Sequence, residues 1–168
     1  MISKKMAQAL SGQINNELYS AYLYLSMSSF TTFSSLNGAA NWFMVQSQEE
    51  MTHAKKFYDY LNSQGEHVQL AAIAEPPTEF GTLLSMFELT LRHEQFITKS
   101  INDLMELAVK EKEHATRIFL QWFVTEQIEE EGNNKDIIAK LKLAGDSTRG
   151  LMMVNRDLAT RVFTSPTA

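Results

Sequence analysis

Apolar residues recur every three or four positions over long stretches of this chain, which is the pattern of helices that bury one face. In the first stretch, from about residue 5 to 33, the recurring positions are Met6, Leu10, Ile14, Leu18, Ala21 and Leu25. Three more stretches of this kind follow: one ends near residue 64, one runs from about 82 to 110, and one from about 113 to 143. The pattern predicts an all-α fold with four long helices.

The links between these stretches indicate how the helices are arranged. The first link is a short polar turn after residue 33, which makes the first two helices antiparallel. The second link, residues 65–80, contains two prolines and is long enough, at roughly 3.3 Å per extended residue, to run the length of a helix. After Gly145, a capped amphipathic segment covers about 147–163. We expect one domain over 1–168: an antiparallel four-helix bundle at about 5–143, with a long crossover between its second and third helices and a short fifth C-terminal helix.

Each of the four predicted helices has a glutamate on or beside its apolar stripe, close to the middle of the helix. These residues are Glu17, Glu50, Glu94 and Glu130. The midpoints of an antiparallel bundle share one level, so the four carboxylates are expected to lie together in the core. Burying unpaired carboxylates costs several kcal/mol each, and no Lys or Arg lies on the inner stripes near this level. The pattern therefore predicts metal ions as the counter-charge.

The residue types narrow the choice of metal. Glu50 and His53 stand three residues apart and so share one helix face. Carboxylates with one imidazole suit iron or manganese and also admit zinc, while the chain has no cysteine to provide thiolate ligands. Di-iron carboxylate bundles carry two Glu-x-x-His motifs, whereas residues 126–130 contain no histidine. We expect iron, with a second ion that has fewer nitrogen ligands and is bound more loosely.

Composition and charge argue against several other classes of function. The net charge is −5 with a pI near 5.4, and no dense run of Lys and Arg offers a site for nucleic acid or for an anionic membrane. No stretch of about 18 apolar residues could span a membrane, and residues 1–12 lack the apolar run of a signal peptide. Since the chain has no cysteine for disulfides, we expect a cytoplasmic protein that binds cations.

Four motifs, in order along the chain, carry a family resemblance. They are Asn15–Ser20, Gln48–His53, His93–Gln95 and Gln121–Gln127. Together they resemble the bacterial non-haem ferritins, and the resemblance covers almost the whole chain. It implies an iron-storage protein with ferroxidase activity, which oxidises Fe(II) inside each bundle with O2 or H2O2. It also implies a hollow homo-oligomeric shell of 24 copies, in whose cavity the ferric mineral is deposited.

The resemblance also implies which residues bind iron. The first iron ion would be bound by Glu17, Glu50 and His53. The second would be bound by Glu94 and Glu130, with Glu50 shared between the two ions and Gln127 close by. A third site would use Glu49, Glu126, Glu129 and Glu130. Tyr24 resembles the tyrosine that lies beside the two-iron centre in this family.

Met51 and His93 need separate interpretation, because each stands next to a predicted metal ligand. Met51 stands where a bacterioferritin has its haem-binding methionine, but methionine is also a common helix residue. Bacterioferritins have the second Glu-x-x-His motif that this chain lacks, so we expect no haem. His93 points about 100° away from Glu94 around its helix, which favours a surface or subunit contact over metal binding.

Three other functions stay open at this point. A purely structural bundle would satisfy its core acids by hydrogen bonds and bind no metal. A DNA-protecting mini-ferritin would place metal ligands between subunits and often carries basic tails, unlike this acidic chain. A di-iron oxygenase or peroxidase would use the same kind of site. Anaerobic titration with iron would identify the structural bundle, which binds none, and retardation of plasmid DNA in electrophoresis would identify the mini-ferritin.

Overall fold

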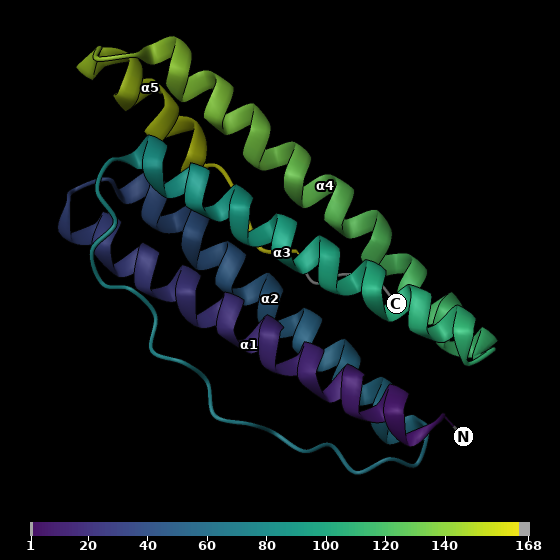
Figure 1. The fold of residues 1–168 in the computed structure, drawn as a ribbon. Coiled ribbons are helices and arrows are strands. Elements are labelled where there is room, and N and C mark those ends of the chain that lie inside the picture. Colours follow the sequence, from purple (N-terminus) through teal and green to yellow (C-terminus); the bar gives the residue numbers. More distant parts are fainter. Residues whose placement is uncertain (1, 165–168) are drawn as a thin grey trace.

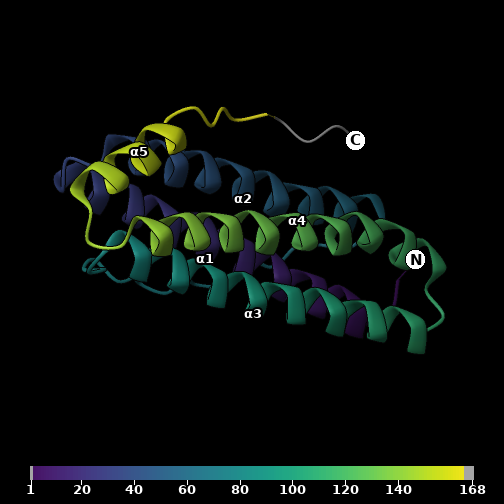
Figure 2. The same cartoon turned by 90° about the horizontal axis from the view of Figure 1, so that it is seen from above.

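The computed structural model describes residues 2–164 and contains, within them, five helices and no strand. The helices are α1 (Lys4–Phe33), α2 (Asn37–Ser63), α3 (Leu83–Lys110), α4 (His114–Ala144) and α5 (Thr148–Leu158). Figures 1 and 2 show the four long helices side by side as a bundle, with α5 packed across one end. The all-α bundle with a short fifth helix is confirmed, while the ends of the expected 1–168 domain lie outside the described residues.

Local sequence signals account for where these helices begin and end. The side chains of Ser3, Thr82 and Ser147 accept hydrogen bonds from backbone N–H groups in the first turns of α1, α3 and α5. Gly65 follows α2 with φ +76°, and Gly145 caps α4 with φ +52°. Glycine adopts such positive φ angles without steric cost, so both helices stop where the sequence indicated.

The long crossover determines the direction of the second half of the bundle. It leaves the end of α2, passes along the outer side of α1 and reaches the start of α3 at the opposite end (Figure 1). The hydroxyl of Ser26 in α1 donates to the carbonyl of Pro77 at 2.6 Å and holds the crossover there. As a result α2 and α3 run in the same direction, while α1 with α2 and α3 with α4 form antiparallel pairs.

The fifth helix is shorter than expected, ending at Leu158 instead of about residue 163. Val162 continues the apolar spacing of α5, yet its side chain is 76% exposed. The amide of Asn41 in α2 donates to the carbonyl of Arg161 at 2.9 Å and lies within 3.5 Å of two carbonyls at the end of α5. These bonds turn the chain back along α2 (Figure 2). The prediction was wrong because apolar spacing does not register such a contact between distant segments.

The apolar core consists of two clusters, one towards each end of the bundle. The first includes Met6, Leu10 and Phe57, and the second includes Phe43 and Phe87. On every long helix the glutamate at mid-length lies between the residues of the two clusters. The clusters hold the helices together on both sides of a polar layer, which is where the site described below lies. None of the helices in the described part is long and apolar enough to cross a membrane.

Candidate metal centre

Four glutamates, one from each long helix, are buried between the two apolar clusters. Glu17, Glu50, Glu94 and Glu130 are each 1–3% exposed. Glu17, Glu50 and Glu94 each lie three or four positions from a core residue of the same helix, and Glu130 lies seven positions, or two turns, from Phe123 and from Ile137. Among residues 2–164, no Lys or Arg forms an ion pair with any of the four. So much buried acid without a directly paired protein cation is a strong reason to consider a metal.

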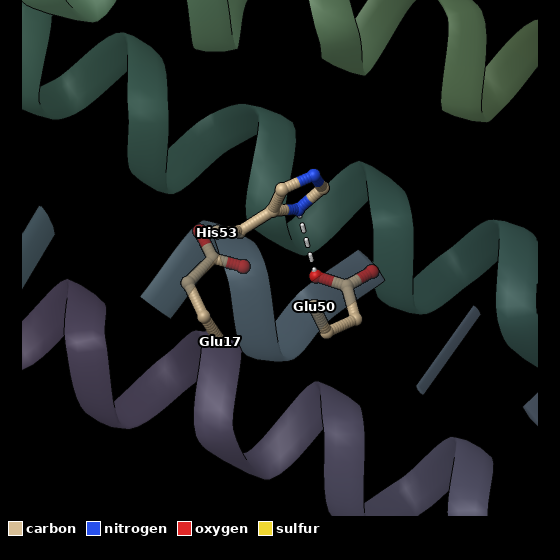
Figure 3. Close-up of side chains that lie close together, drawn as sticks. All are labelled: Glu17, Glu50 and His53. Carbon is tan, nitrogen blue, oxygen red and sulfur yellow. Dashed lines mark hydrogen bonds and ion pairs between the residues drawn. The ribbon is translucent and has the colours of Figure 1, made fainter. Parts of the chain in front are cut away.

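Three ligand-type side chains converge in this layer. Glu17 from α1 and Glu50 and His53 from α2 offer atoms within 4.8 Å of one another. Figure 3 shows the three side chains facing each other, with Nδ1 of His53 at 3.1 Å from Oε2 of Glu50. The Oε2 atom of Glu17 and the Nε2 atom of His53 are buried without a hydrogen-bond partner. Buried polar atoms rarely lack a partner, and a cation seated between these groups would satisfy the free carboxylate oxygen.

Glu94 lies beside this group and is held by hydrogen bonds from two helices. The Tyr24 hydroxyl in α1 donates to its Oε1 atom. Nε2 of Gln127 in α4 donates to its Oε2 atom at 3.2 Å and also lies within 3.3 Å of the Thr98 hydroxyl. The structure therefore brings Tyr24 and Gln127, both singled out from the sequence, into contact with the same carboxylate.

Gln46 joins the acids of α2 and α4. Its Nε2 atom donates to Oε1 of Glu50 at 3.1 Å and to Oε2 of Glu130 at 2.9 Å. Similarly, Nε2 of Gln13 donates to Oε1 of Glu17 at 2.8 Å. Sequence reasoning missed both glutamines. Each precedes a core glutamate by four positions on one helix face, a spacing that could have revealed them.

Burial dominates the electrostatics of this layer. It raises the pKa of Glu17 and of Glu94 to about 8, with repulsion from the Glu50 carboxylate as the next cause. The pKa values of Glu50 and Glu130 are raised as well, by burial and then by repulsion from Glu130 and Glu94 respectively. Without metal the layer holds protons at neutral pH, and a bound cation would release them.

A second group of acids, Glu49, Glu126 and Glu129, adjoins Glu130 on α2 and α4, and we call these four residues the acidic shelf. Glu49 and Glu126 are partly buried and Glu129 is exposed. Burial raises the pKa of Glu49, and repulsion from Glu126 and Glu129 adds to the increase. Oε1 of Glu126 lies 3.8 Å from Nε2 of His53, so the shelf borders the Glu17–Glu50–His53 group.

One cationic side chain reaches this level from outside the inner stripes of the long helices. Arg161 forms an ion pair with Glu49, and it comes from the segment after α5 and not from a long helix. The two residues are 112 positions apart in the chain. No periodicity relates such distant positions, and the sequence offers no signal for this contact.

Two residues considered for other roles lie away from the metal ligands. Nε2 of His93 is 2.8 Å from the Ser20 hydroxyl, and its ring lies edge-on to Tyr24 with centroids 6.0 Å apart. His93 is partly buried and contacts Ser20 on α1, and burial lowers its pKa to about 4. The expected surface or subunit contact stays a prediction. Met51 is half exposed on α2.

Comparison with known proteins agrees with this architecture. The ferritin-like domain family matches residues 7–144. The chain is 46% identical to a bacterial non-haem ferritin of Campylobacter jejuni over 93% of each chain, and 40% identical to one of Escherichia coli over 95% of this chain and 97% of that one. An Archaeoglobus fulgidus ferritin engineered into a closed form superposes with a TM-score of 0.96 at 47% identity, covering 98% of this chain and 100% of the other. The chain belongs to the ferritin family, among the non-haem ferritins.

Proposed function

We propose that this protein stores iron and acts as a ferroxidase. The observation that carries the proposal is the buried group of Glu17, Glu50 and His53, in which a carboxylate oxygen and an imidazole nitrogen lack partners. Oxygen ligands with one nitrogen suit iron, and the layer has no thiolate that would favour a softer metal. The relatives named above are non-haem ferritins, which supports iron as the substrate.

In this proposal Fe(II) binds as a pair in each bundle. Glu17, Glu50 and His53 bind the first ion, and their mutual distances support that assignment. Glu94 and Glu130 bind the second, with Glu50 between the two ions; the link through Gln46 from Glu50 to Glu130 supports this. Gln127 and Tyr24 hold Glu94 in place. The acidic shelf is the third site, which receives iron from the pair or passes it on.

The chemistry requires electron and proton balance. Each Fe(II) gives up one electron, so a pair of ions reduces O2 to peroxide, and a second pair reduces that H2O2 to water. The peroxide takes up two protons for each pair of irons oxidised. Because the core glutamates have raised pKa values, binding of Fe(II) displaces protons from the same layer. Tyr24 lies against Glu94 and is placed to donate a hydrogen bond throughout.

We also propose that the chain assembles into a closed shell of 24 copies around a mineral cavity. Large apolar side chains are exposed on the single subunit, and those more than two-thirds exposed are Phe33, Ile118, Ile128, Leu143 and Val162. Exposed apolar surface of this kind commonly marks subunit contacts. Light scattering after size exclusion should give about half a megadalton, from 24 chains of 19.1 kDa. A monomer or dimer under all conditions would refute the shell.

Stopped-flow absorbance with anaerobic Fe(II) mixed against O2 tests the ferroxidase. Wild type should oxidise iron in a fast phase, and Glu17→Ala, Glu50→Ala and His53→Ala should each lose it, because each removes one of three ligands to the first ion. Glu106→Ala is the matched control, since Glu106 is exposed on α3 and away from the polar layer. Oxidation by wild type no faster than by these variants, or no iron uptake at all, would leave a structural bundle as the better reading.

A further inference from the structure

The segment after α5 delivers a cation to the acidic shelf. The Nη2 atom of Arg161 pairs with Oε2 of Glu49, and the two side chains are 19% and 18% exposed. The guanidinium also lies over the Trp42 ring, 4.4 Å from the ring centroid. Burial raises the pKa values of Glu49, Glu126 and Glu130, and the charge of Arg161 acts against that rise at each of them. Arg161 therefore pairs with one carboxylate of the shelf and acts on two others through its charge.

This placement is built into the fold and does not result from a loose side chain. Asn41 in α2 donates to the backbone carbonyl of Arg161 at 2.9 Å, which fixes the main chain at the point where the side chain leaves it. Stacking on Trp42 then directs the guanidinium along α2 towards Glu49. Backbone anchor, ring and carboxylate together hold the charge in one position.

Arg161 also determines the orientation of a side chain in the metal layer. Its Nη1 atom donates to Oε1 of Gln46 at 2.6 Å. Arginine has no acceptor atoms, so the carbonyl end of the Gln46 amide must face it. The amide nitrogen then points inward, where it donates to Glu50 and Glu130. A chain of hydrogen bonds thus runs from the C-terminal segment to two acids assigned to the iron pair.

We propose that Arg161 is a built-in counter-cation of the acidic shelf, which a third metal ion must displace from Glu49 in order to bind. While Arg161 is in place, Gln46 is held with its amide nitrogen on Glu50 and Glu130. When the ion takes Glu49, the guanidinium withdraws and releases Gln46. The inference rests on the proposed third site, and it makes Arg161 a positioning residue that weakens and thereby regulates binding there.

Calorimetric titration of the assembled, iron-free protein with Zn2+ tests the competition, because zinc binds carboxylates and imidazole without redox chemistry. We expect two tighter zinc ions and one weaker ion per subunit. Arg161→Gln should tighten the weakest step about threefold or more, as partly exposed ion pairs of this kind are worth up to about a fivefold change. The two tighter steps should change less.

Two further variants separate the effect of Arg161's direct contact with Glu49 from the effect of a positive charge near the shelf. Lys56 lies near the shelf, where its charge lowers the pKa of Glu126, but its Nζ atom stacks on Trp122 and forms no ion pair with Glu49. Lys56→Gln removes the same charge and should affect the weakest step less than Arg161→Gln does. Arg161→Lys keeps the charge yet cannot hold Glu49 and Gln46 with a planar fork, so it should restore part of the wild-type affinity.

Tryptophan fluorescence can report the displacement of the Arg161 guanidinium. The chain has two tryptophans, so Trp122→Phe leaves Trp42 as the single tryptophan, with the Arg161 guanidinium over its ring. Trp42 emission should change during the weakest zinc step, and the change should vanish in Trp122→Phe with Arg161→Gln. Three zinc ions in both proteins with equal affinities and no emission change would overturn the inference alone. Two zinc ions in both would overturn the third site and the inference with it.

Discussion

A Cβ atom added to Gly38 would lie 1.6 Å from the backbone carbonyl oxygen of Asn155, so the start of α2 and α5 approach each other more closely than any side chain permits. The Asn155 side chain extends the contact, since its Oδ1 atom accepts a hydrogen bond from the N–H of Ala39 at 2.9 Å. Val154 and Leu158 are buried beside it. The docking of α5 therefore depends on a backbone contact as well as on apolar packing.

Gly38→Ala should undock α5. The obstacle is backbone, which cannot rotate away as a flexible side chain can, so the helix must shift and lose its hydrogen bond to Ala39. We expect a lower thermal midpoint and loss of the large assembly, measured by calorimetry and by light scattering. A variant that assembles and melts like wild type would contradict this account of the contact.

Gly12→Ala is the matched control. Gly12 lies inside α1, and nothing stands within 4 Å of an added Cβ atom. Alanine favours a helix interior over glycine by about 1 kcal/mol, so this substitution should leave assembly intact and stabilise the subunit slightly. The two variants make the same chemical change with opposite expected signs.

The metal-free protein should lose stability as the pH rises from 6.5 to 8. Glu17 and Glu94 have pKa values near 8 when folded against 4.5 otherwise, so the folded chain holds more protons than the unfolded chain in this window. Their stabilising contribution is fully present below the unfolded pKa and is lost as the pH passes the folded pKa. His93 acts in the opposite sense, since its pKa falls from 6.5 to about 4 and its contribution is lost as the pH drops below 6.5.

Thermal midpoints across that pH window, with and without Zn2+, measure the effect. The zinc-loaded protein should lack the decline, because its carboxylates are already ionised, and Glu94→Gln should flatten the decline in the metal-free protein. A metal-free midpoint that rises between pH 6.5 and 8 would show that these glutamates are ionised in the empty fold.

Most of this fold could be predicted from the sequence because its helices are set by residues close to one another in the chain. Apolar spacing and capping residues such as Thr82 and Gly65 set the long helices, and the glutamates at mid-helix marked the polar layer. What the sequence could not provide were contacts between distant segments. Asn41 ends α5 early and Arg161 reaches Glu49 from 112 positions away, and neither contact follows a helical period.

Removing the Tyr24 hydroxyl should weaken the binding of the second metal ion. That hydroxyl donates to Glu94 and favours its ionised form. A hydrogen bond to a charged group is worth about 1.5–3 kcal/mol, so Tyr24→Phe should weaken the second zinc step roughly tenfold or more. Tyr22→Phe is the control, since Tyr22 is 48% exposed on the same helix. Equal zinc affinities in the two variants would show that the hydroxyl contributes nothing to that step.

Loss of Glu49 and loss of Glu126, two residues of the acidic shelf, should affect the first fast turnover differently. Glu49 pairs with Arg161 and forms no ion pair with His53, whereas Oε1 of Glu126 lies 3.8 Å from Nε2 of His53. Groups that orient a metal-binding imidazole influence the metal itself. Glu49→Gln should therefore leave the first fast turnover near the wild-type rate, while Glu126→Gln should slow it several-fold.

Both variants should also lose the iron bound on the shelf, which an oxygen electrode combined with stopped-flow absorbance can detect. In the first turnover the pair oxidises two irons for each O2, because reduction of O2 to peroxide takes two electrons and each Fe(II) supplies one. Two further Fe(II), one of them held on the shelf, then reduce the peroxide with two protons to two waters. The wild-type ratio should therefore rise from two towards four, and it should stay closer to two in Glu49→Gln with its first turnover intact. If Glu49→Gln abolished that turnover as completely as Glu50→Ala, then Glu49 would belong to the iron pair, and the shelf would not be a separate site.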